Sequence, residues 1–285
     1  MRYLFLRFPE GKIKALTFSY DDGVKADIRL ASIFDRYGLK GTFNINSDYI
    51  GADAGRLTEE EIRTHLLDAG HEIAVHGARH IAPGAAVPSV AIEDILRCRR
   101  ELETRFDRLV RGMAYPDSGV KRLHGANTYE DVRSYVRSLG ISYARTLGGD
   151  NDGFALPCDL YAWMPTAHHN NPALFDYAAR FLAVDESNLY SSSRYPRLFY
   201  LWGHSYEFDR DGNWDRIERF CEEMSGKSDV YYGTNGDVAD YVTAFSRLVA
   251  SADGTRLYNP TARTLWVDAD GALYRIAPDE TVRTD

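Results

Sequence analysis

The stretch LTFSYDDG, residues 16–23, contains the pattern from which the fold of this chain is inferred. Large apolar side chains, among them Phe18 and Tyr20, alternate with smaller or polar ones at the period of two that is typical of a strand. The strand ends at two adjacent carboxylates, Asp21 and Asp22, which are followed by a glycine. Because a glycine lets the chain turn sharply, both carboxylates can converge beyond the strand's end, whereas inside a strand they would point to opposite faces. The stretch therefore predicts chemistry at the C-terminal end of a strand, although Asp-Asp-Gly also occurs in plain solvated turns.

Strand patterns and amphipathic helical patterns alternate along most of the chain. Strands are expected at 13–20, 41–46, 71–77, 111–116, 141–146, 197–204 and 230–234. Helices are expected between and after them at 25–38, 56–70, 89–109, 128–140, 172–183, 213–226 and 237–251. Such alternation indicates an α/β fold with a parallel sheet, wound either into a barrel or into an open doubly wound form. The number of strand-helix units, about seven, favours the (β/α) barrel.

Three segments stand outside this alternation. Residues 2–8 are expected to form a hairpin with the first core strand. Residues 147–172 are irregular, with one short strand expected at 161–164, and long irregular loops in compact domains are usually functional. Residues 251–285 carry alternating apolar side chains around a turn, which indicates a small antiparallel β appendage. We therefore expect residues 1–250 to form the barrel and the remainder to form an appendage packed on it.

The composition limits the partners and the compartment. With 285 residues, 44% of them hydrophobic, the chain can bury a sizeable core. Its net charge of -8 at pH 7 disfavours nucleic acid or an anionic membrane as a partner and suits a neutral or cationic substrate. Cys98, Cys158 and Cys221 lie far apart in the sequence, so neither a disulfide framework nor a cysteine metal site is expected. The N-terminal apolar run is interrupted by Arg7, so a cytoplasmic chain is expected, although a chain trimmed of a leader would look the same.

Polar candidates stand at the predicted strand ends, where the catalytic groups of a (β/α) barrel are found. His76 ends one strand and His80 follows it by four residues, while His204 ends another strand. Tyr115 and Arg145 stand at the ends of two further strands. An Asp with two His is a ligand set suited to zinc or a similar divalent ion, with positions left open for water and substrate. A His pair at this spacing, taken alone, could equally lie in a solvated loop.

Four short stretches resemble motifs of the polysaccharide deacetylases of carbohydrate esterase family 4. TFSYDDG is similar to the family's Thr-Phe-Asp-Asp-Gly, with two extra residues, and HGARH is similar to His-[Ser/Thr]-x-x-His, with Gly77 in place of the hydroxyl residue. MAYPDSG is similar to Arg-Pro-Pro-Tyr-Gly, and LWGH is similar to Leu-x-x-His. The likeness covers roughly residues 12–245.

The resemblance implies a fold and a division of roles. The fold of the family is a distorted (β/α) barrel of about seven strands. By this likeness Asp22, His76 and His80 bind a divalent metal ion, Asp21 is the catalytic base and His204 is the catalytic acid. Zinc is the expected metal, with cobalt, nickel or manganese as alternatives.

The chain departs from the family at two motifs. The arginine of the third motif, which holds the catalytic Asp, is replaced by Ala114. Arg145 is the expected substitute, with a plain structural arginine as the alternative. The fourth motif, whose Asp tunes the catalytic His, has no clear copy. Its candidate replacements, none of them favoured, are Asp150, Asp152 and Asp159.

Substrate contacts are expected from residues close to the strand ends. Tyr115 and Trp202 could stack on sugar rings, with core packing as the alternative explanation. His168 and His169 could face substrate, or they could be plain loop residues beside Asn-Asn-Pro. A backbone N–H near Tyr115 would stabilise the oxyanion that forms during the reaction.

Three functions fit these features. The first is a metal-dependent deacetylase, a hydrolase of C–N bonds other than peptide bonds, which acts on N-acetylated or O-acetylated sugars and polysaccharides. The second keeps the metal but hydrolyses a non-sugar C–N bond of the cyclic amide type. The third is a carbohydrate-binding protein without catalysis, which would need neither Asp21 nor His204, although both are present. The expected partner is an acetylated carbohydrate, and the sequence leaves the oligomeric state open.

Overall fold

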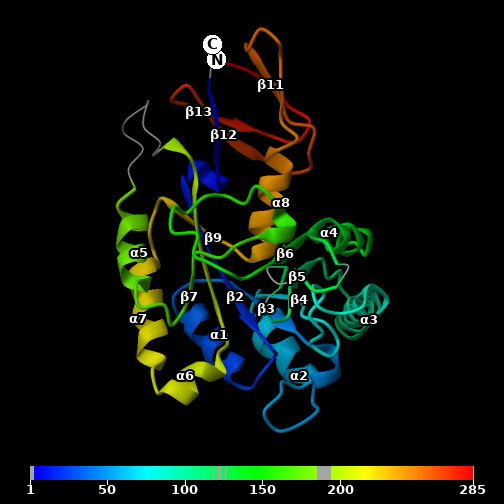
Figure 1. Cartoon of the computed structure of the whole chain (residues 1–285). Coiled ribbons are helices and arrows are strands. Elements are labelled where there is room, and N and C mark those ends of the chain that lie inside the picture. The colour runs from blue at the N-terminus through cyan, green and yellow to red at the C-terminus, as the bar shows by residue number, and fades with distance from the viewer. Residues whose placement is uncertain (1–2, 118, 121–122, 126, 185–193, 285) are drawn as a thin grey trace.

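A curled sheet of parallel strands forms the centre of the protein (Figure 1). The computed structural model describes residues 3–117, 119–120, 123–125, 127–184 and 194–284. The sheet runs in the order β6-β5-β4-β3-β2-β8-β7, and β9 pairs with β2 beside this path. Its strands are β2 (Lys14–Asp21), β3 (Gly41–Ile45), β4 (Glu72–Val75), β5 (Gly112–Ala114), β6 (Tyr143–Arg145), β7 (Ala167–His168), β8 (Arg197–Gly203) and β9 (Val230–Tyr232).

Strand β2 is the longest in this sheet, and every one of its residues is buried. Along one edge it pairs with β8 from Lys14 to Tyr20. Along the other edge it pairs first with β9, up to Leu16, and then with β3, from Phe18 to Asp21. The predicted LTFSYDDG strand is therefore the central strand of the sheet, and its C-terminal end lies among the ends of its neighbours.

The two outer strands of the sheet approach each other through the irregular stretch 147–172. Trp163 forms a parallel bridge with Arg145 in β6, and a few residues later β7 pairs with β8. The sheet is thus curled into a distorted barrel, which confirms the predicted α/β fold of about seven parallel strands. The short strand expected at 161–164 is reduced to this bridge, which follows the 3-10 helix η4 (Leu160–Ala162).

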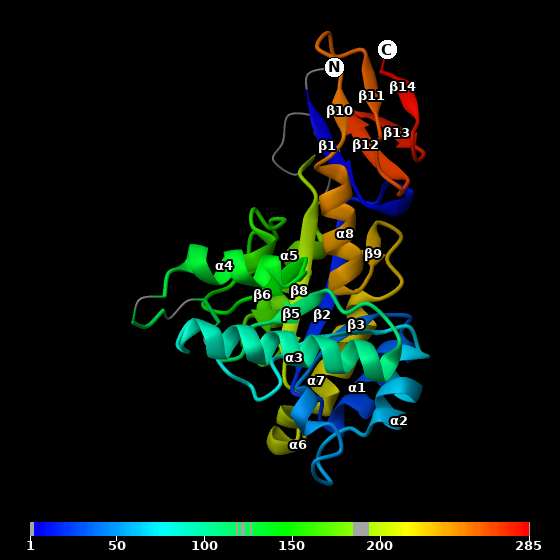
Figure 2. The same ribbon diagram turned by 90° about the vertical axis from the view of Figure 1, so that its right-hand side faces the viewer.

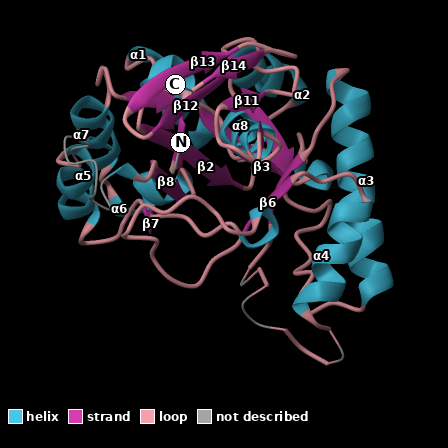
Figure 3. Cartoon of the chain, turned by 90° about the horizontal axis from the view of Figure 1, so that it is seen from above, coloured by secondary structure: helices cyan, strands magenta, loops and turns pink. Residues whose placement is uncertain are grey.

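Helices flank the central strands on both sides (Figure 3). They are α1 (Ala26–Arg36), α2 (Glu59–Glu61), α3 (Pro88–Phe106), α4 (Tyr129–Ser138), α5 (Leu174–Leu182), α6 (Tyr206–Asp211), α7 (Trp214–Met224) and α8 (Asn235–Phe245), with short turns η1 (Pro9–Gly11), η2 (Ser47–Tyr49) and the π-helical η3 (Ile62–Leu67). A capping box is present at the start of α2, where Thr58 Oγ1 accepts the Glu61 N–H at 3.2 Å and the Glu61 carboxylate accepts the Thr58 N–H at 2.7 Å. None of the described helices is both long and apolar enough to span a membrane.

Two small antiparallel sheets lie at the end of the molecule where the two chain termini meet (Figure 2). They consist of β1 (Leu4–Arg7), β12 (Leu265–Ala269) and β13 (Ala272–Ile276), and of β10 (Val249–Ala250), β11 (Arg256–Tyr258) and β14 (Thr281–Arg283). The hairpin expected from residues 2–8 and the first core strand is wrong, because β1 pairs instead with β12, from Leu4 opposite Ala269 to Arg7 opposite Trp266. The domain boundary expected at residue 250 stays a prediction.

The first residues of α8 close a polar network at the N-terminal half of the barrel. Asn235 is fully buried, its Nδ2 donates to Thr17 Oγ1 at 2.8 Å, and its Oδ1 accepts the Tyr200 hydroxyl at 2.9 Å. The Asn235 backbone N–H donates to Thr42 Oγ1 at 2.9 Å, and the next N–H donates to the Glu72 carboxylate at 2.8 Å. Because buried polar groups need partners, this network ties α8 to four strands of the barrel.

We expect Asn235→Ala to lower the free energy of unfolding by about 2 to 4 kcal/mol, because it leaves the buried Tyr200 and Thr17 hydroxyls without their partner. Urea unfolding followed by circular dichroism measures this as a lower midpoint with an unchanged slope. Glu222→Ala, at an exposed position of α7, is the control and should change stability by no more than about 0.5 kcal/mol. Equal midpoints for the two variants would show that the network does not support the fold.

Candidate metal and acid-base site

Six polar side chains from four strand ends converge at the C-terminal end of the barrel. They are Asp21 and Asp22 at the end of β2, His76 and His80 after β4, Arg145 at the end of β6 and His204 after β8. The sequence predicted these residues at strand ends or, for His80, four residues beyond one, and parallel strands bring such ends to one edge of the sheet.

The turn after β2 points the adjacent carboxylates of Asp21 and Asp22 in different directions. Asp22 has φ of +83°, a conformation that is uncommon for a residue with a side chain, and Gly23 follows with φ of +62°. The Asp22 N–H still donates to Asn44 O at 3.0 Å, which keeps the turn beside β3. Asp21 therefore stays buried in the strand, while Asp22 turns toward the two histidines.

Asp22, His76 and His80 present three ligand atoms that lie within 4.8 Å of one another. Nε2 of His76 and Nε2 of His80 are each 3.7 Å from Asp22 Oδ1. His76 Nδ1 lies 2.9 Å from the Ala114 carbonyl oxygen, a backbone contact that fixes the ring and leaves Nε2 facing the centre. The donor set, the spacing and the held tautomer fit a divalent cation.

Gly77 departs from the family motif for a reason that the packing explains. A Cβ on this glycine would lie 2.5 Å from Asp94 Oδ2, and the glycine has φ of +72°. Asp94 is buried, and its Oδ1 accepts the Arg79 N–H at 3.0 Å. Asp94 thus occupies the space of the missing side chain and holds the loop between the two histidines.

Asp21 is 2% exposed and has partners on all sides. Its Oδ1 accepts the Asn44 side-chain amide at 2.8 Å, and its Oδ2 forms an ion pair with Arg145 Nη2. The same Oδ2 lies 3.9 Å from Nε2 of His76 and 3.9 Å from Nε2 of His204. Burial alone would raise the pKa of Asp21, but the charge of Arg145, with smaller contributions from the two histidines and the amide, brings the pKa below its usual value.

Arg145 contacts Asp21, as expected of the arginine that the third motif lacks. It is 1% exposed, and its guanidinium carbon lies 4.6 Å from the centre of a Trp202 ring. It comes from β6, whereas Ala114, which stands at the family's arginine position, lies in β5 directly beside it. The charge thus reaches Asp21 from the neighbouring strand.

His204 stands between two carboxylates. Its Nε2 faces Asp21, and its Nδ1 lies 3.7 Å from Oε2 of Glu207, a residue that the sequence analysis missed. Burial would lower the pKa of His204, but Glu207, Asp21 and Asp22 together raise it above the ordinary value. The signal for Glu207 was its spacing of three residues from His204, which brings it onto the first turn of α6.

The three aspartates considered for the fourth motif are engaged elsewhere. Asp150 accepts from the Asn171 amide at 2.6 Å, Asp152 pairs with Arg180 at 3.2 Å, and Asp159 accepts the Tyr129 hydroxyl at 2.6 Å. No contact of any of them with His204 is recorded among the described residues.

Two of the expected substrate contacts lie in the core. Tyr115 is 1% exposed, and its backbone N–H donates to Arg145 O at 3.0 Å within the sheet, so neither group is open to a substrate or an oxyanion. His169 is also 1% exposed, and its ring packs against those of Tyr20 and Phe208, with interplanar angles of 13° and 29°. The strand-end rule located Tyr115, and His169 was singled out in the irregular loop, but the sequence did not show which way either side chain points.

The other two expected contacts lie beside the site. The rings of His168 and Trp202 are partly exposed, and their centres are 4.6 Å apart. The Trp202 ring centre lies 5.8 Å from that of His204. Their contact with substrate stays a prediction.

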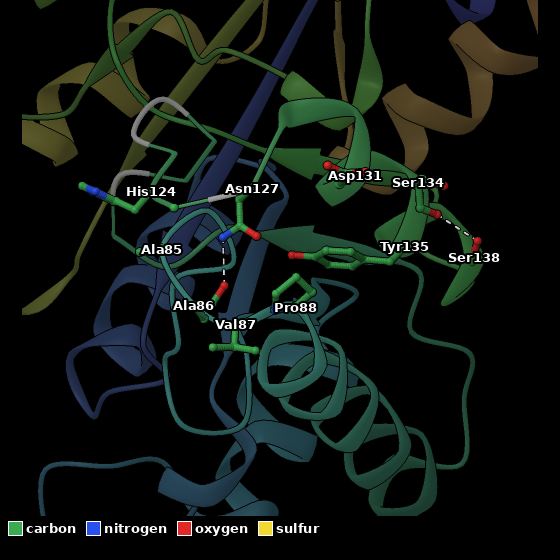
Figure 4. A pocket seen from close by; sticks show the side chains of 11 residues that line it. Ala85, Ala86, Val87, Pro88, His124, Asn127, Asp131, Ser134, Tyr135 and Ser138 are labelled. Atoms are coloured by element: carbon green, nitrogen blue, oxygen red, sulfur yellow. Dashed lines mark hydrogen bonds between the residues drawn. The ribbon is translucent and has the colours of Figure 1, made fainter.

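A cavity of about 670 Å³ lies between the start of α3 and the side of α4 (Figure 4). Its lining includes Val87, Pro88, His124, Asn127 and Tyr135. None of the six converging side chains lines this cavity, so it is separate from the candidate site.

Comparison with known proteins finds a family model that matches part of the chain. Residues 9–144 match the family model described as polysaccharide deacetylase. A search of curated proteins finds no match. The resemblance stated from the motifs is thus supported by a match that spans Asp21, Asp22, His76 and His80.

Solved structures share the fold at low sequence identity. A putative polysaccharide deacetylase from Mycobacterium smegmatis is 19% identical with a TM-score of 0.56, over 85% of this chain and 94% of that one. A probable polysaccharide deacetylase from Pseudomonas aeruginosa PAO1 is 16% identical with a TM-score of 0.58, over 82% and 92% of the two chains. Puue allantoinase is 15% identical with a TM-score of 0.57, over 82% and 91%. These similarities show a common fold, and the family model described as polysaccharide deacetylase matches the half of the chain that carries β2 to β5.

Proposed function

We propose that the protein is a metal-dependent hydrolase that removes acetyl groups from N-acetylated or O-acetylated sugars. One observation carries the proposal: Asp21 Oδ2 lies 3.9 Å both from His76 of the candidate metal group and from His204. A base therefore stands between a metal ligand and an acid, as hydrolysis of an amide or ester by an activated water requires.

Asp22, His76 and His80 would hold the cation. Zinc is the proposed ion, with cobalt, nickel or manganese as alternatives, because an Asp with two His suits these metals. A divalent cation in such a site lowers the pKa of bound water and polarises a carbonyl group. Three protein ligands leave coordination positions free for water and substrate.

Asp21 is the proposed base. It must be ionised to accept a proton from the attacking water, and its lowered pKa keeps it ionised at neutral pH. Arg145 keeps the carboxylate charged, and the Asn44 amide holds its other oxygen in place. The carboxylate thus has one fixed orientation toward the centre of the site.

His204 is the proposed acid. Its raised pKa favours the protonated ring, and its Nε2 faces the same centre as Asp21. The proton on Nε2 would pass to the leaving amine or alcohol as the bond to the acetyl carbon breaks. Base and acid are then separate residues, so the rate should fall at both low and high pH.

The proposed substrate class comes from the family match, since polysaccharide deacetylases act on acetylated carbohydrate. The partly exposed rings of Trp202 and His168 beside His204 are suited to contact with a sugar ring. The net charge of -8 is consistent with a substrate that is neutral or becomes cationic when its acetyl group is lost.

A second candidate keeps the same residues but changes the substrate. The fold is as similar to Puue allantoinase, with a TM-score of 0.57, as it is to the deacetylases. A metal-dependent hydrolase of a cyclic amide would use the same base, acid and cation. Only the substrate separates the two candidates.

The first test measures metal content and acetate release together. We expect one equivalent of zinc, cobalt, nickel or manganese per chain and acetate release from acetylated chitooligosaccharides, xylan or peptidoglycan fragments. Asp22→Ala should weaken metal affinity by more than about 100-fold, since even partners that only orient a ligand change affinity by about 10- to 100-fold. It should abolish acetate release as well.

His65→Ala is the matched control, because this histidine is exposed on η3 and outside the site. It should bind metal and release acetate like the unaltered protein. Metal binding without acetate release would favour the cyclic amide candidate, which ring-opening assays on cyclic amides then test. A protein that binds no metal after reconstitution would refute the ligand assignment.

The role of Arg145 is tested by the pH dependence of kcat/KM. Activity rises with pH as Asp21 loses its proton, so removing the positive charge should raise the pKa of Asp21 and move the acid limb to higher pH. We expect a shift of about 1 to 3 pH units in Arg145→Gln, the usual effect of one neighbouring opposite charge, and a smaller one in Arg145→Lys. A lower rate with the limb unmoved would show that Arg145 has only a structural role.

A further inference from the structure

One carboxylate oxygen lies among three imidazole rings on the acid side of the site. Oε2 of Glu207 is 2.9 Å from Nε2 of His168, 3.1 Å from Nε2 of His169 and 3.7 Å from Nδ1 of His204. Its other oxygen, Oε1, lies 3.6 Å from Arg210 at the surface. Three histidines and one arginine therefore surround the carboxylate of Glu207.

The atoms in this cluster depend on one another. Glu207 Oε2, His204 Nδ1 and both ring nitrogens of His169 are buried, and none has a hydrogen bond of standard geometry to any described residue. A buried carboxylate without a partner is strongly disfavoured, so the neighbouring imidazoles must stabilise the negative charge of Glu207. The ion-pair distances above are the contacts that do so.

The orientation of His204 makes this contact relevant to the reaction. The ring has Nε2 toward Asp21 and Nδ1 toward Glu207, with 3.9 Å and 3.7 Å to the two carboxylate oxygens. A neutral imidazole carries only one N–H, so it can donate to one of these carboxylates but not to both. Two facing carboxylates thus favour the ring with protons on both nitrogens, which is the form that an acid needs.

We infer that Glu207 is a positioning residue for His204, which it keeps oriented and doubly protonated, and that His168 shares the same carboxylate oxygen and connects the acid to solvent. The inference rests on the proposed function, because it deepens the role of the proposed acid. Of His168 and His204, which both face Glu207 Oε2, His168 is the more exposed and His204 faces the site.

The surrounding structure holds Glu207 in place. Ser205 Oγ donates to Asp27 Oδ1 at 2.6 Å, which ties the start of α6 to α1. A Cβ on Gly203 would lie 2.0 Å from His169 Nδ1, so the glycine makes room for the stacked histidine beneath α6. Burial lowers the pKa of His169 to about 4, so at neutral pH this ring is uncharged and acts as packing.

The charge on His204 depends on groups from every element around it. They are Asp21 and Asp22 from the end of β2, His168 and His169 from the end of β7, and Tyr206 and Glu207 from α6. Glu207 is the largest favourable influence among them, and its own pKa is far below the usual range because three imidazoles face it.

A second cation is the competing explanation for the cluster. His168, His204 and Glu207 offer three ligand atoms within 4.8 Å of one another, as the Asp22 group does. If a cation bound there, Nδ1 of His204 would be a metal ligand and could not carry a proton. Metal stoichiometry therefore separates the two explanations.

The test follows the histidine rings of the zinc-loaded protein by two-dimensional ¹H–¹⁵N NMR, which reports the tautomer and charge of each ring as pH is varied. The His204 signals are assigned by their loss in His204→Gln. Glu207→Gln should lower the pKa of His204 by about 1 to 3 units, as expected when one neighbouring opposite charge is removed, and Glu207→Asp should restore part of the shift. Glu130→Gln, on the surface of α4, is the matched control and should leave the titration unchanged.

A second variant gives a shift of opposite sign. His168→Asn removes one of the rings that share Glu207, so the carboxylate acts more strongly on His204 and the pKa of His204 should rise. A purely structural role for Glu207 predicts no opposed shifts in the two variants, and equal titration of His204 in all of them would overturn the inference. A second equivalent of zinc that is lost in both Glu207→Gln and His168→Asn would overturn it in favour of a second metal site.

These readouts do not require acetate release. If the protein hydrolyses no acetylated sugar while the opposed shifts are seen, the proposed substrate is wrong and the positioning role of Glu207 stands. If acetate is released and the shifts are missing, the proposed function stands and the inference about Glu207 fails.

Discussion

The buried ion pair between Asp21 and Arg145 is the interaction on which the candidate site depends. The two residues are in β2 and β6, which are separated by β3, β4 and β5 in the sheet. In a flat sheet four strand spacings of about 4.8 Å would hold these strands about 19 Å apart. The contact therefore exists only because the sheet is curled. Each charge stabilises the other in the barrel interior, where a single unpaired charge would be strongly disfavoured.

Around this pair the site divides into two halves with different chemistry. On one side Asp22 and two histidines face each other at distances that suit a cation between them. On the other side Glu207 Oε2 lies 3.7 Å from His204 Nδ1 and 2.9 Å from His168 Nε2, so a carboxylate faces the proposed acid there. Asp21 contacts a histidine of each half through the same oxygen, so the barrel's central strand carries the one group that both halves share.

Much of this could be predicted from sequence because it depends on local pattern. A period of two followed by Asp-Asp-Gly located the end of β2, and the rule that barrel sites lie at strand ends found Arg145 without any motif. What failed depends on distant contacts or on side-chain direction. The partner of β1 is more than 250 residues away, and Tyr115 and His169 stand at strand ends but point into the core. Glu207 was missed because a carboxylate partner for His204 was sought only in the loop before β7.

The pairing of β1 with β12 has a consequence for how the chain is made. Leu4 lies opposite Ala269, so β1 leaves the ribosome more than 250 residues before its partner β12 and cannot pair until β12 has been made. The barrel strands, whose neighbours are mostly close in sequence, can assemble earlier. During synthesis β1, just ahead of β2, is thus an unpaired strand edge until β12 pairs with it.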